Sequence, residues 1–375
     1  MSSSSKKLLL RRPPRAHLWL GLRLALSAAV LLCVLALLRI HPRAPPPRSP
    51  SSAEWTNPKI AFLFLARSNL PLDFVWHAFF QNAEVGNYSI YVHSEPGFVL
   101  DRSTTRSAFF YDRQLKESVK VSWGESTMIE AERRLLATAL QDPANQRFAL
   151  ISDSCVPLYN FSYVYSYLMS SSKSFVDSFL DKKEGRYNPK MSPAIPKEKW
   201  RKGSQWIALV RKHAEVIVAD NAVYPIFKRH CKRRLGLDVG RKNAPKSAAE
   251  KEHNCIPDEH YVQTLLSMNE LEHEIERRTL TYTLWNQSSN HMDKKTWHPM
   301  TFEYADASPQ HIKEIKSINH VYYNTEYRTE WCQCNATLVP CFLFARKFSR
   351  GAAMRVLSEG IVGPFDASAL LINSS

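Results

Sequence analysis

One uninterrupted apolar segment, at residues 24–38, constrains this chain more than any other feature of its sequence. The wider stretch 18–40 is long enough to cross a bilayer, because a spanning helix needs about 20 mostly apolar residues. Arg23 lies near one end of that stretch, where its side chain can extend back to the lipid headgroups. The apolar core also suits a cleaved signal peptide, but no small-residue cleavage site follows it. We therefore expect an uncleaved signal anchor, and the basic, Ser- and Pro-rich flanks argue against a buried core helix.

The flanks of this segment predict its orientation and the organisation of the chain. Residues 1–17 are basic, so the positive-inside rule places them in the cytosol and the C-terminal part in a lumen. Residues 41–58 are rich in Pro and Ser, which predicts an extended stem. The expected parts are a cytosolic tail at 1–17, a transmembrane helix at 18–40, a stem at 41–58, one folded luminal domain at 59–350 and a C-terminal tail at 351–375.

The formal net charge of +15 is concentrated at the N-terminus. Residues 1–50 contain nine Lys and Arg and no acid, which leaves 15 − 9 = +6 for the rest of the chain. This excess suits an anionic small ligand or an acidic polysaccharide and does not require nucleic acid as a partner.

Cysteines and glycosylation sequons agree with a luminal body. Cys33 lies in the apolar segment, and the six remaining cysteines allow three disulfides with 15 possible pairings. A zinc site is the weaker alternative, because the 332/334 pair is separated by one residue and no second close pair exists. Candidate N-glycosylation sites are Asn87, Asn160, Asn286, Asn335 and Asn373.

The folded part alternates strand and helix patterns. Short apolar runs at 59–65 and 148–151 are typical of buried parallel strands, and a third strand is expected at 88–93. Helices are expected at 72–82 and 127–140. The alternation predicts an α/β domain with a doubly wound, mostly parallel sheet and flanking helices. Further expected elements are a strand at 119–121, a long loop at 182–201, a strand at 207–210, a helix at 213–220, a helix at 257–268 and a strand at 341–345.

Ligands bind such sheets beyond the carboxyl ends of the strands. This rule places Arg67, His93 and Asp153 together on one rim of the predicted sheet. Two basic residues, Arg346 and Lys347, follow another apolar run. Basic groups at a strand end can hold a diphosphate, although a solvated face is the simpler explanation.

Glu259 is the strongest candidate for catalysis. It lies in the first turn of the helix expected at 257–268, where an acid also complements the helix dipole by about 0.3–1 kcal/mol. His260 beside it is expected to be structural. Ser204, Gln205 and Trp206 offer a hydroxyl, an amide and an aromatic ring, the groups that grip sugars, but such a Trp can equally belong to the core.

Four segments in order carry a resemblance to a known family. They are Trp-Arg-Lys-Gly-Ser-Gln-Trp at 200–206, Pro-Asp-Glu-His at 257–260, Tyr-Arg-Thr-Glu-Trp-Cys at 327–332 and Phe-Leu-Phe-Ala-Arg-Lys-Phe at 342–348. Over residues 59–351 the chain resembles the core-2/I-branching β-1,6-N-acetylglucosaminyltransferase-like family, glycosyltransferase family 14, and is most similar to its plant branch. An Asp-x-Asp metal motif is missing from the sequence.

The resemblance implies a fold, a compartment and a reaction. Family members are type II Golgi membrane proteins with a GT-A-like fold, and they invert at the anomeric carbon without a metal. The donor is expected to be a UDP-sugar, N-acetylglucosamine or a related sugar, and the acceptor a hydroxyl of a glycan or glycoprotein. Plant cell-wall polymers and arabinogalactan-type glycoproteins are the acceptors that the plant branch suggests. No cofactor is expected.

The resemblance also assigns roles to residues of this chain. Glu259 matches the family's general base, and Lys347 matches a lysine that contacts the donor diphosphate. Arg328 is the best match for a second diphosphate-binding residue, at a different spacing. The nucleoside contacts fall near Ala66, Arg67 and His93; the animal enzymes carry an Asp where His93 stands.

Two other functions remain open from the sequence. One is a non-catalytic Golgi glycan-binding or scaffold protein on a degenerate transferase fold, against which the retained Glu259 and Lys347 count. The other is a secreted hydrolase with paired carboxylates, for which no second acid stands out as a partner of Glu259.

Overall fold

The computed structural model describes residues 27–30, 57–183, 185–233, 254–285, 299–334 and 337–362. The chain divides into two units, at residues 1–56 and 57–375. In the first unit the description covers a short helical stretch at 27–30. Across the described ranges, no helix combines the length and the hydropathy needed to cross a membrane. The predicted tail at 1–17, most of the predicted anchor and most of the stem lie outside the described residues.

The second unit is built on a six-stranded sheet with the strand order β2-β1-β3-β6-β5-β7. The strand β1 pairs in parallel with β2 and β3, β6 is antiparallel to β3 and β5, and β5 is parallel to β7. The predicted mostly parallel α/β sheet is confirmed. The bounds are β1 Lys59–Leu65, β2 Tyr88–His93, β3 Asn145–Ser152, β5 Ser174–Phe175, β6 Ala208–Val210 and β7 Ile275–Glu276.

A smaller sheet and two hairpins complete the strands of this unit. In the smaller sheet β13 lies in the middle, antiparallel to β4 and parallel to β8. The hairpins pair β9 with β10 and β11 with β12. The bounds are β4 Val156–Pro157, β8 Thr281–Thr283, β9 His320–Tyr323, β10 Arg328–Trp331, β11 Gln333–Cys334, β12 Thr337–Leu338 and β13 Phe344–Arg346.

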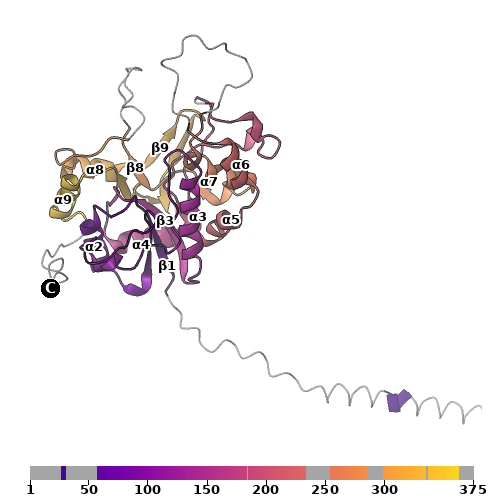
Figure 1. Ribbon diagram of the computed structural model, residues 1–375, viewed down its shortest axis with the longest axis horizontal. Helices are drawn as coiled ribbons and strands as arrows, with labels where there is room; N and C mark the ends of the chain where they lie inside the picture. The colour runs from indigo at the N-terminus through magenta and orange to yellow at the C-terminus, as the bar shows by residue number, and fades with distance from the viewer. Residues whose placement is uncertain are drawn as a thin grey trace, which may run out of the picture. The chain divides into compact units, whose positions relative to one another are not determined.

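Helices cover both faces of the main sheet, and Figure 1 shows α2 and α9 on one side of it and α3 and α5 on the other. The α-helices are α2 Asp73–Gln81, α3 Thr127–Ala139, α4 Phe161–Ser170, α5 Arg211–Ala219, α6 Val223–His230, α7 Tyr261–Met268, α8 Pro309–Ser317 and α9 Arg350–Ser358. The 3₁₀-helices are η1 Val85–Asn87, η2 Ala108–Phe110, η3 Pro189–Met191, η4 Lys197–Lys199, η5 Pro257–Glu259 and η6 Glu272–Glu274.

The core lies in two clusters, one on each face of the sheet. Alternate side chains of β1 point to opposite faces, so Phe62 and Phe64 enter the first cluster and Ala61 and Leu63 enter the second. The first cluster also takes side chains from α2, α4 and α9, and the second takes them from α3, α5 and α7. This burial on both faces explains why β1 is apolar without alternation.

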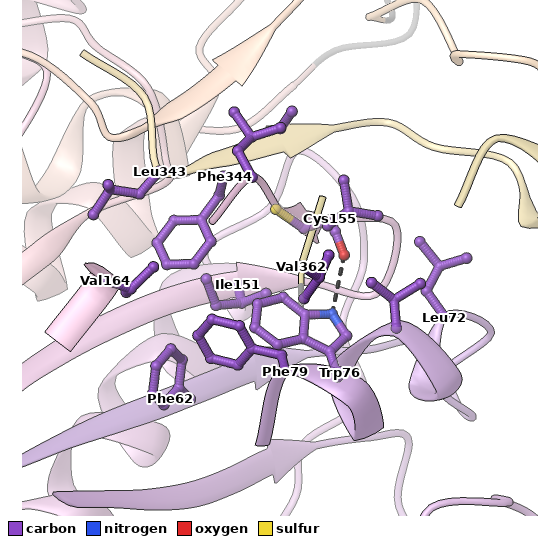
Figure 2. Close-up of a cluster of buried hydrophobic side chains, with 14 of the residues drawn as sticks. Phe62, Leu72, Trp76, Phe79, Ile151, Cys155, Val164, Leu343, Phe344 and Val362 are labelled. Carbon is purple, nitrogen blue, oxygen red and sulfur yellow. Dashed lines mark hydrogen bonds between the residues drawn. The ribbon is translucent and has the colours of Figure 1, made fainter. Parts of the chain in front are cut away.

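The first cluster is rich in aromatic rings (Figure 2). The indole of Trp76 meets the ring of Phe64 edge to face at 4.9 Å between centroids, and its Nε1–H donates to the carbonyl oxygen of Cys155 at 3.0 Å. This hydrogen bond ties α2 to the turn after β3, next to the strand ends.

Two disulfides are present among the described residues, Cys231–Cys255 and Cys332–Cys341. The prediction that all six luminal cysteines can pair is wrong for Cys155, which is a free thiol buried in the first core cluster. The side chain of Cys334 lies outside the described residues.

Three predicted elements differ from those observed. Residues 119–121 form no strand, because the Val119 N–H donates to the ring of His93 instead of to a neighbouring strand. The predicted helix at 257–268 is divided into η5 and α7. The predicted last strand begins at Phe344, since Cys341 is committed to a disulfide and Leu343 N–H bonds to Leu280.

Candidate active site

A cavity of about 1780 Å³ opens at the carboxyl ends of β1, β2 and β3. Arg67, His93 and Asp153, which follow these three strands, all line it. The predicted common rim is therefore observed. Glu259 and Lys347 line the same cavity, although they are distant from the rim residues along the chain.

The backbone at one end of the cavity continues the ladder between β1 and β2. Ala66 N–H donates to the carbonyl of His93 at 2.9 Å, and Glu95 N–H donates to the carbonyl of Arg67 at 2.9 Å. The ring of His93 is 1% exposed, and its Nε2 accepts from the Val119 N–H at 3.2 Å. Burial lowers the pKa of His93 to about 4, so the ring is neutral near pH 7 with its proton on Nδ1. The backbone of these residues is thus fixed, and the His93 ring beside it is uncharged.

Three basic side chains gather near Asp153. Burial lowers the pKa of Lys347, and the charges of Arg346 and Arg67 lower that pKa further, while Asp153 raises it. Arg346 is held in place because its guanidinium lies over the ring of Trp206, 4.4 Å from the centroid. Close cations repel one another, so this end of the cavity favours a ligand that brings negative charge.

Arg328 is placed differently from the expectation that it joins this group. It does not line the cavity among the described residues, and its guanidinium is bonded to Glu326 at 2.7 Å, to Glu330 and to the Ser178 carbonyl at 3.0 Å. It also lies over the ring of Tyr323, 4.1 Å from the centroid. Since Tyr323 lines the cavity, Arg328 supports the wall from behind, and Arg346 is the second basic residue beside Lys347.

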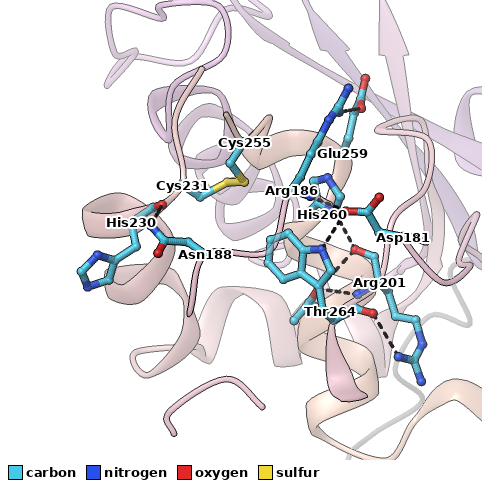
Figure 3. Close-up of a disulfide and its surroundings, with 11 residues drawn as sticks. Asp181, Arg186, Asn188, Arg201, His230, Cys231, Cys255, Glu259, His260 and Thr264 are labelled. Carbon is cyan, nitrogen blue, oxygen red and sulfur yellow. Dashed lines mark hydrogen bonds and ion pairs between the residues drawn. A yellow bond between two sulfur atoms is a disulfide. The ribbon is translucent and has the colours of Figure 1, made fainter. Parts of the chain in front are cut away.

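Glu259 ends η5 and lines the cavity. Figure 3 shows its carboxyl group beside the guanidinium of Arg186. Its Oε2 accepts from Arg186 Nη1 at 2.5 Å and lies 3.9 Å from Lys202 Nζ. The glutamate side chain is 22% exposed and that of Arg186 is 11% exposed. Arg186 belongs to the loop expected at 182–201, so that loop lies next to the candidate base.

A second carboxyl group, that of Asp258, adjoins Glu259, and a third, that of Glu132, lies close to Asp258. Asp258 is 7% exposed and Glu132, from α3, is 4% exposed. Burial raises the pKa of Asp258, and the charge of Glu259 raises it further, to about 7. Burial, followed by the charge of Asp258, raises the pKa of Glu132 well above its usual range. Gln205 Nε2 donates to Glu132 Oε1 at 2.7 Å, which fixes the inner carboxyl.

The segment at 203–206 forms one wall of the cavity. Gly203 allows a close approach, because a Cβ there would stand 1.8 Å from the carbonyl oxygen of Asp177. The Ser204 N–H donates to Asp177 Oδ2 at 2.9 Å, and Trp206 is 6% exposed in the second core cluster. The three predicted acceptor-binding residues thus meet in the cavity wall, although Gln205 and Trp206 are engaged by protein groups.

The segment that carries Glu259 is held from both sides (Figure 3). The disulfide of Cys255 to Cys231 precedes η5, and His260 follows it, stacked on Trp200 with 4.5 Å between ring centroids. Burial lowers the pKa of His260 to about 3, and its Nδ1 donates to the Arg201 carbonyl at 2.8 Å. His260 is therefore a structural residue, as expected.

Metal ligands are not grouped in the part of the chain that the structure describes: three or more His, Cys, Asp or Glu side chains nowhere come together in it to hold an ion. The basic side chains near Asp153 are the described groups suited to a diphosphate.

Of the predicted glycosylation sites, Asn160 is exposed at the start of α4, where its Oδ1 accepts from the Tyr163 N–H at 3.0 Å. Asn87 is half-buried in η1. Asn286 and Asn335 lie outside the described residues, as does Asn373.

Sequence reasoning missed several charged residues at the cavity or just behind its wall, among them Arg186, Asp177 and Glu132. Arg186 is one of many basic residues in its loop, and Glu132 looks like an ordinary acid on an amphipathic helix. The sequence held one signal of a cluster of carboxyl groups, namely that Asp258 stands directly before Glu259.

Comparisons with known proteins identify the family. Residues 60–316 match the family model of the Core-2/I-branching enzymes. The glycosyltransferase BC10 of Oryza sativa subsp. japonica is 56% identical over 317 residues, which cover 84% of this chain and 79% of the rice protein. The chain therefore belongs to the Core-2/I-branching enzyme family and is a glycosyltransferase.

Proposed function

We propose that this glycosyltransferase moves a sugar, N-acetylglucosamine or a related one, from a UDP-sugar to a hydroxyl group of a glycan or glycoprotein, with inversion and without a metal ion. The observation that carries the proposal is one cavity with Glu259 at one place and the cations Arg346 and Lys347 at another. The first is a base for an acceptor hydroxyl, and the others offset the charge of a diphosphate.

Glu259 is the proposed general base. Arg186 and Lys202 both approach Oε2, and the described residues place no hydrogen bond on Oε1. Oε1 therefore takes the acceptor proton as the hydroxyl oxygen attacks C1 of the donor sugar. Proton removal by a positioned base contributes about 10²–10⁴-fold to the rate.

Lys347 and Arg346 are the proposed leaving-group residues. As the new C1–O bond forms, the bond from C1 to the diphosphate oxygen breaks and UDP departs with its electron pair. Two unit charges 4 Å apart near a protein surface attract by about 4 kcal/mol, which lysine and arginine supply without a metal. Ala66, Arg67 and His93 would contact the nucleoside, and Ser204, Gln205 and Trp206 would face the acceptor.

The setting is also part of the proposal. The apolar segment at 24–38 and the similarity to Golgi enzymes favour a single-pass type II protein with a luminal catalytic domain. Similarity to a rice glycosyltransferase favours plant cell-wall polymers or arabinogalactan-type glycoproteins as acceptors. A non-catalytic scaffold is disfavoured because Glu259, Arg346 and Lys347 all line the same cavity.

The test compares the full-length protein with its Glu259→Gln variant on a panel of UDP-sugars and glycan acceptors. We expect Glu259→Gln to lower the transfer rate by about 10²–10⁴-fold and to leave UDP binding unchanged. Glu117→Gln is the matched control, because Glu117 is 91% exposed and does not line the cavity. Wild-type transfer by Glu259→Gln refutes the role of the base, and loss of transfer in EDTA refutes the metal-free mechanism.

A further inference from the structure

The cavity contains a carboxyl group that the mechanism above does not use. Asp258 lines the cavity beside Glu259 and is more than nine-tenths buried. Its Oδ1 has no hydrogen-bond partner among the described residues. A buried polar atom of this kind is nearly always satisfied in a working protein, so one that lies at a ligand cavity points to a group on the ligand.

The charges around Asp258 decide which form of its carboxyl group is present. Glu259 stands next to it in η5, and Glu132 approaches from α3, which packs against η5. Arg186 and Arg346 are the cations that face it. Three neighbouring carboxyl groups do not all ionise together, and Glu259 has the closest cation.

The protonated form of Asp258 therefore predominates in mildly acidic solution. Burial and the charge of Glu259 raise its pKa to about 7. Below that pH Asp258 carries a proton and is a hydrogen-bond donor. Two adjacent carboxyl groups in different environments can thus have different chemical roles, as they do in other acid–base sites.

We propose that Asp258 is a substrate-positioning residue whose neutral carboxyl group donates a hydrogen bond from Oδ1 to the carbonyl oxygen of an amide group on the sugar substrate next to Glu259. The inference rests on the proposed function and deepens it. The protonated carboxyl group of Asp258 offers an O–H donor at a fixed position. The ligand atom that it binds is therefore a hydrogen-bond acceptor. Loss of the proton leaves two acceptor oxygens, the carboxylate and the carbonyl, facing each other with no donor between them.

The pH dependence of the reaction is the signature of this role. The active form is the protonated one, so activity is present below the pKa of Asp258 and is lost as the pH rises through it. We expect kcat/KM to fall above about pH 7, by up to tenfold for each further pH unit.

The experiment measures kcat and KM, for donor and acceptor separately, between pH 5.5 and 8.5 on the full-length wild type, Asp258→Asn and Asp258→Leu. Asparagine keeps an N–H donor and cannot ionise, so Asp258→Asn is expected to lose a few-fold in kcat/KM at pH 6 and to lose the alkaline decline. Leucine has no donor, and about 10- to 100-fold is lost at every pH. The substrate whose KM rises carries the oxygen. Asp101→Asn, at a position fully exposed and away from the cavity, is the control and keeps the wild-type profile.

The outcomes separate this inference from the proposed function. An active wild type whose alkaline decline persists in Asp258→Asn overturns the inference alone. The same holds if Asp258→Leu matches Asp258→Asn with both variants folded by circular dichroism. A wild type that transfers no sugar from any donor overturns the proposed function, and the inference with it.

Discussion

Replacing Gly203 by Ala tests how the cavity wall positions the base. Gly203 is outside the left-handed region of φ, so the requirement for glycine is space and not backbone conformation. A Cβ at this position stands 1.8 Å from the Asp177 carbonyl oxygen, whereas real Cβ contacts stay above 3.0 Å. The two segments must therefore separate by at least about 1.2 Å. The Gly203 N–H donates to the Glu259 carbonyl at 2.9 Å, so the base-bearing segment is displaced with the wall.

This displacement sets the expected magnitudes. Overpacking of a tight interior costs about 1–3 kcal/mol, and each kcal/mol lowers Tm by about 2 °C in a folded domain of roughly 300 residues. A misplacement of about 1 Å at a catalytic group lowers the rate by about 10²-fold. UDP affinity is expected to be unchanged, because the cations near Asp153 belong to β13 and to the end of β1.

The assay measures Tm by circular dichroism, kcat for sugar transfer and the Kd of UDP by calorimetry. Gly86→Ala is the matched control: its Cβ meets nothing within 4 Å, and it is expected to be neutral or to stabilise by about 0.4–1 kcal/mol. A Gly203→Ala protein with the wild-type Tm and kcat would show that the wall adapts freely, and would refute the argument.

Two further changes test the cations and the disulfide. We expect Lys347→Met to raise the Kd of UDP by about 10-fold or more through the loss of a charged contact. Arg328→Met is expected to leave that Kd unchanged and to lower Tm, because Glu326 and Glu330 lose their partner; the reverse pattern would restore Arg328 to the diphosphate site. Replacing Cys231 and Cys255 by Ser removes a disulfide with a sequence separation of 24, and is expected to cost about 3 kcal/mol in the free energy of unfolding and to lower kcat more than UDP affinity. Denaturant titration measures the free energy of unfolding, and the assays of kcat and of the Kd of UDP measure the effect on the site. An unchanged kcat would show that the disulfide does not position Glu259.

The long elements of the fold were predictable because their signals are local. The apolar runs at 59–65 and 88–93 became β1 and β2 with the predicted bounds. The two-residue strands β4 and β5 were not predictable, since they exist only through pairing with segments far along the chain. Residues 119–121 carry strand-forming side chains, but their backbone is used by a histidine ring.

The site was predictable where one motif carried it. The motif singled out Glu259, which lines the cavity, whereas Arg186 stands 73 residues earlier and touches it only through the folding of a loop. The sequence does not show that Arg346 lines the cavity while Arg328 is engaged in ion pairs of the β9–β10 hairpin. The sequence shows which residues are charged, but only the folded structure shows which of them form ion pairs.

The central position of β13 in the smaller sheet has a consequence for biosynthesis. This strand is among the last parts of the domain to be translated. It inserts between β4 and β8, which are synthesised earlier and cannot form this sheet without it. Arg346 and Lys347 arrive with it, so a nascent or prematurely terminated chain has only Arg67 of the three basic side chains near Asp153. The basic end of the cavity is thus assembled only when translation of the folded domain is nearly complete.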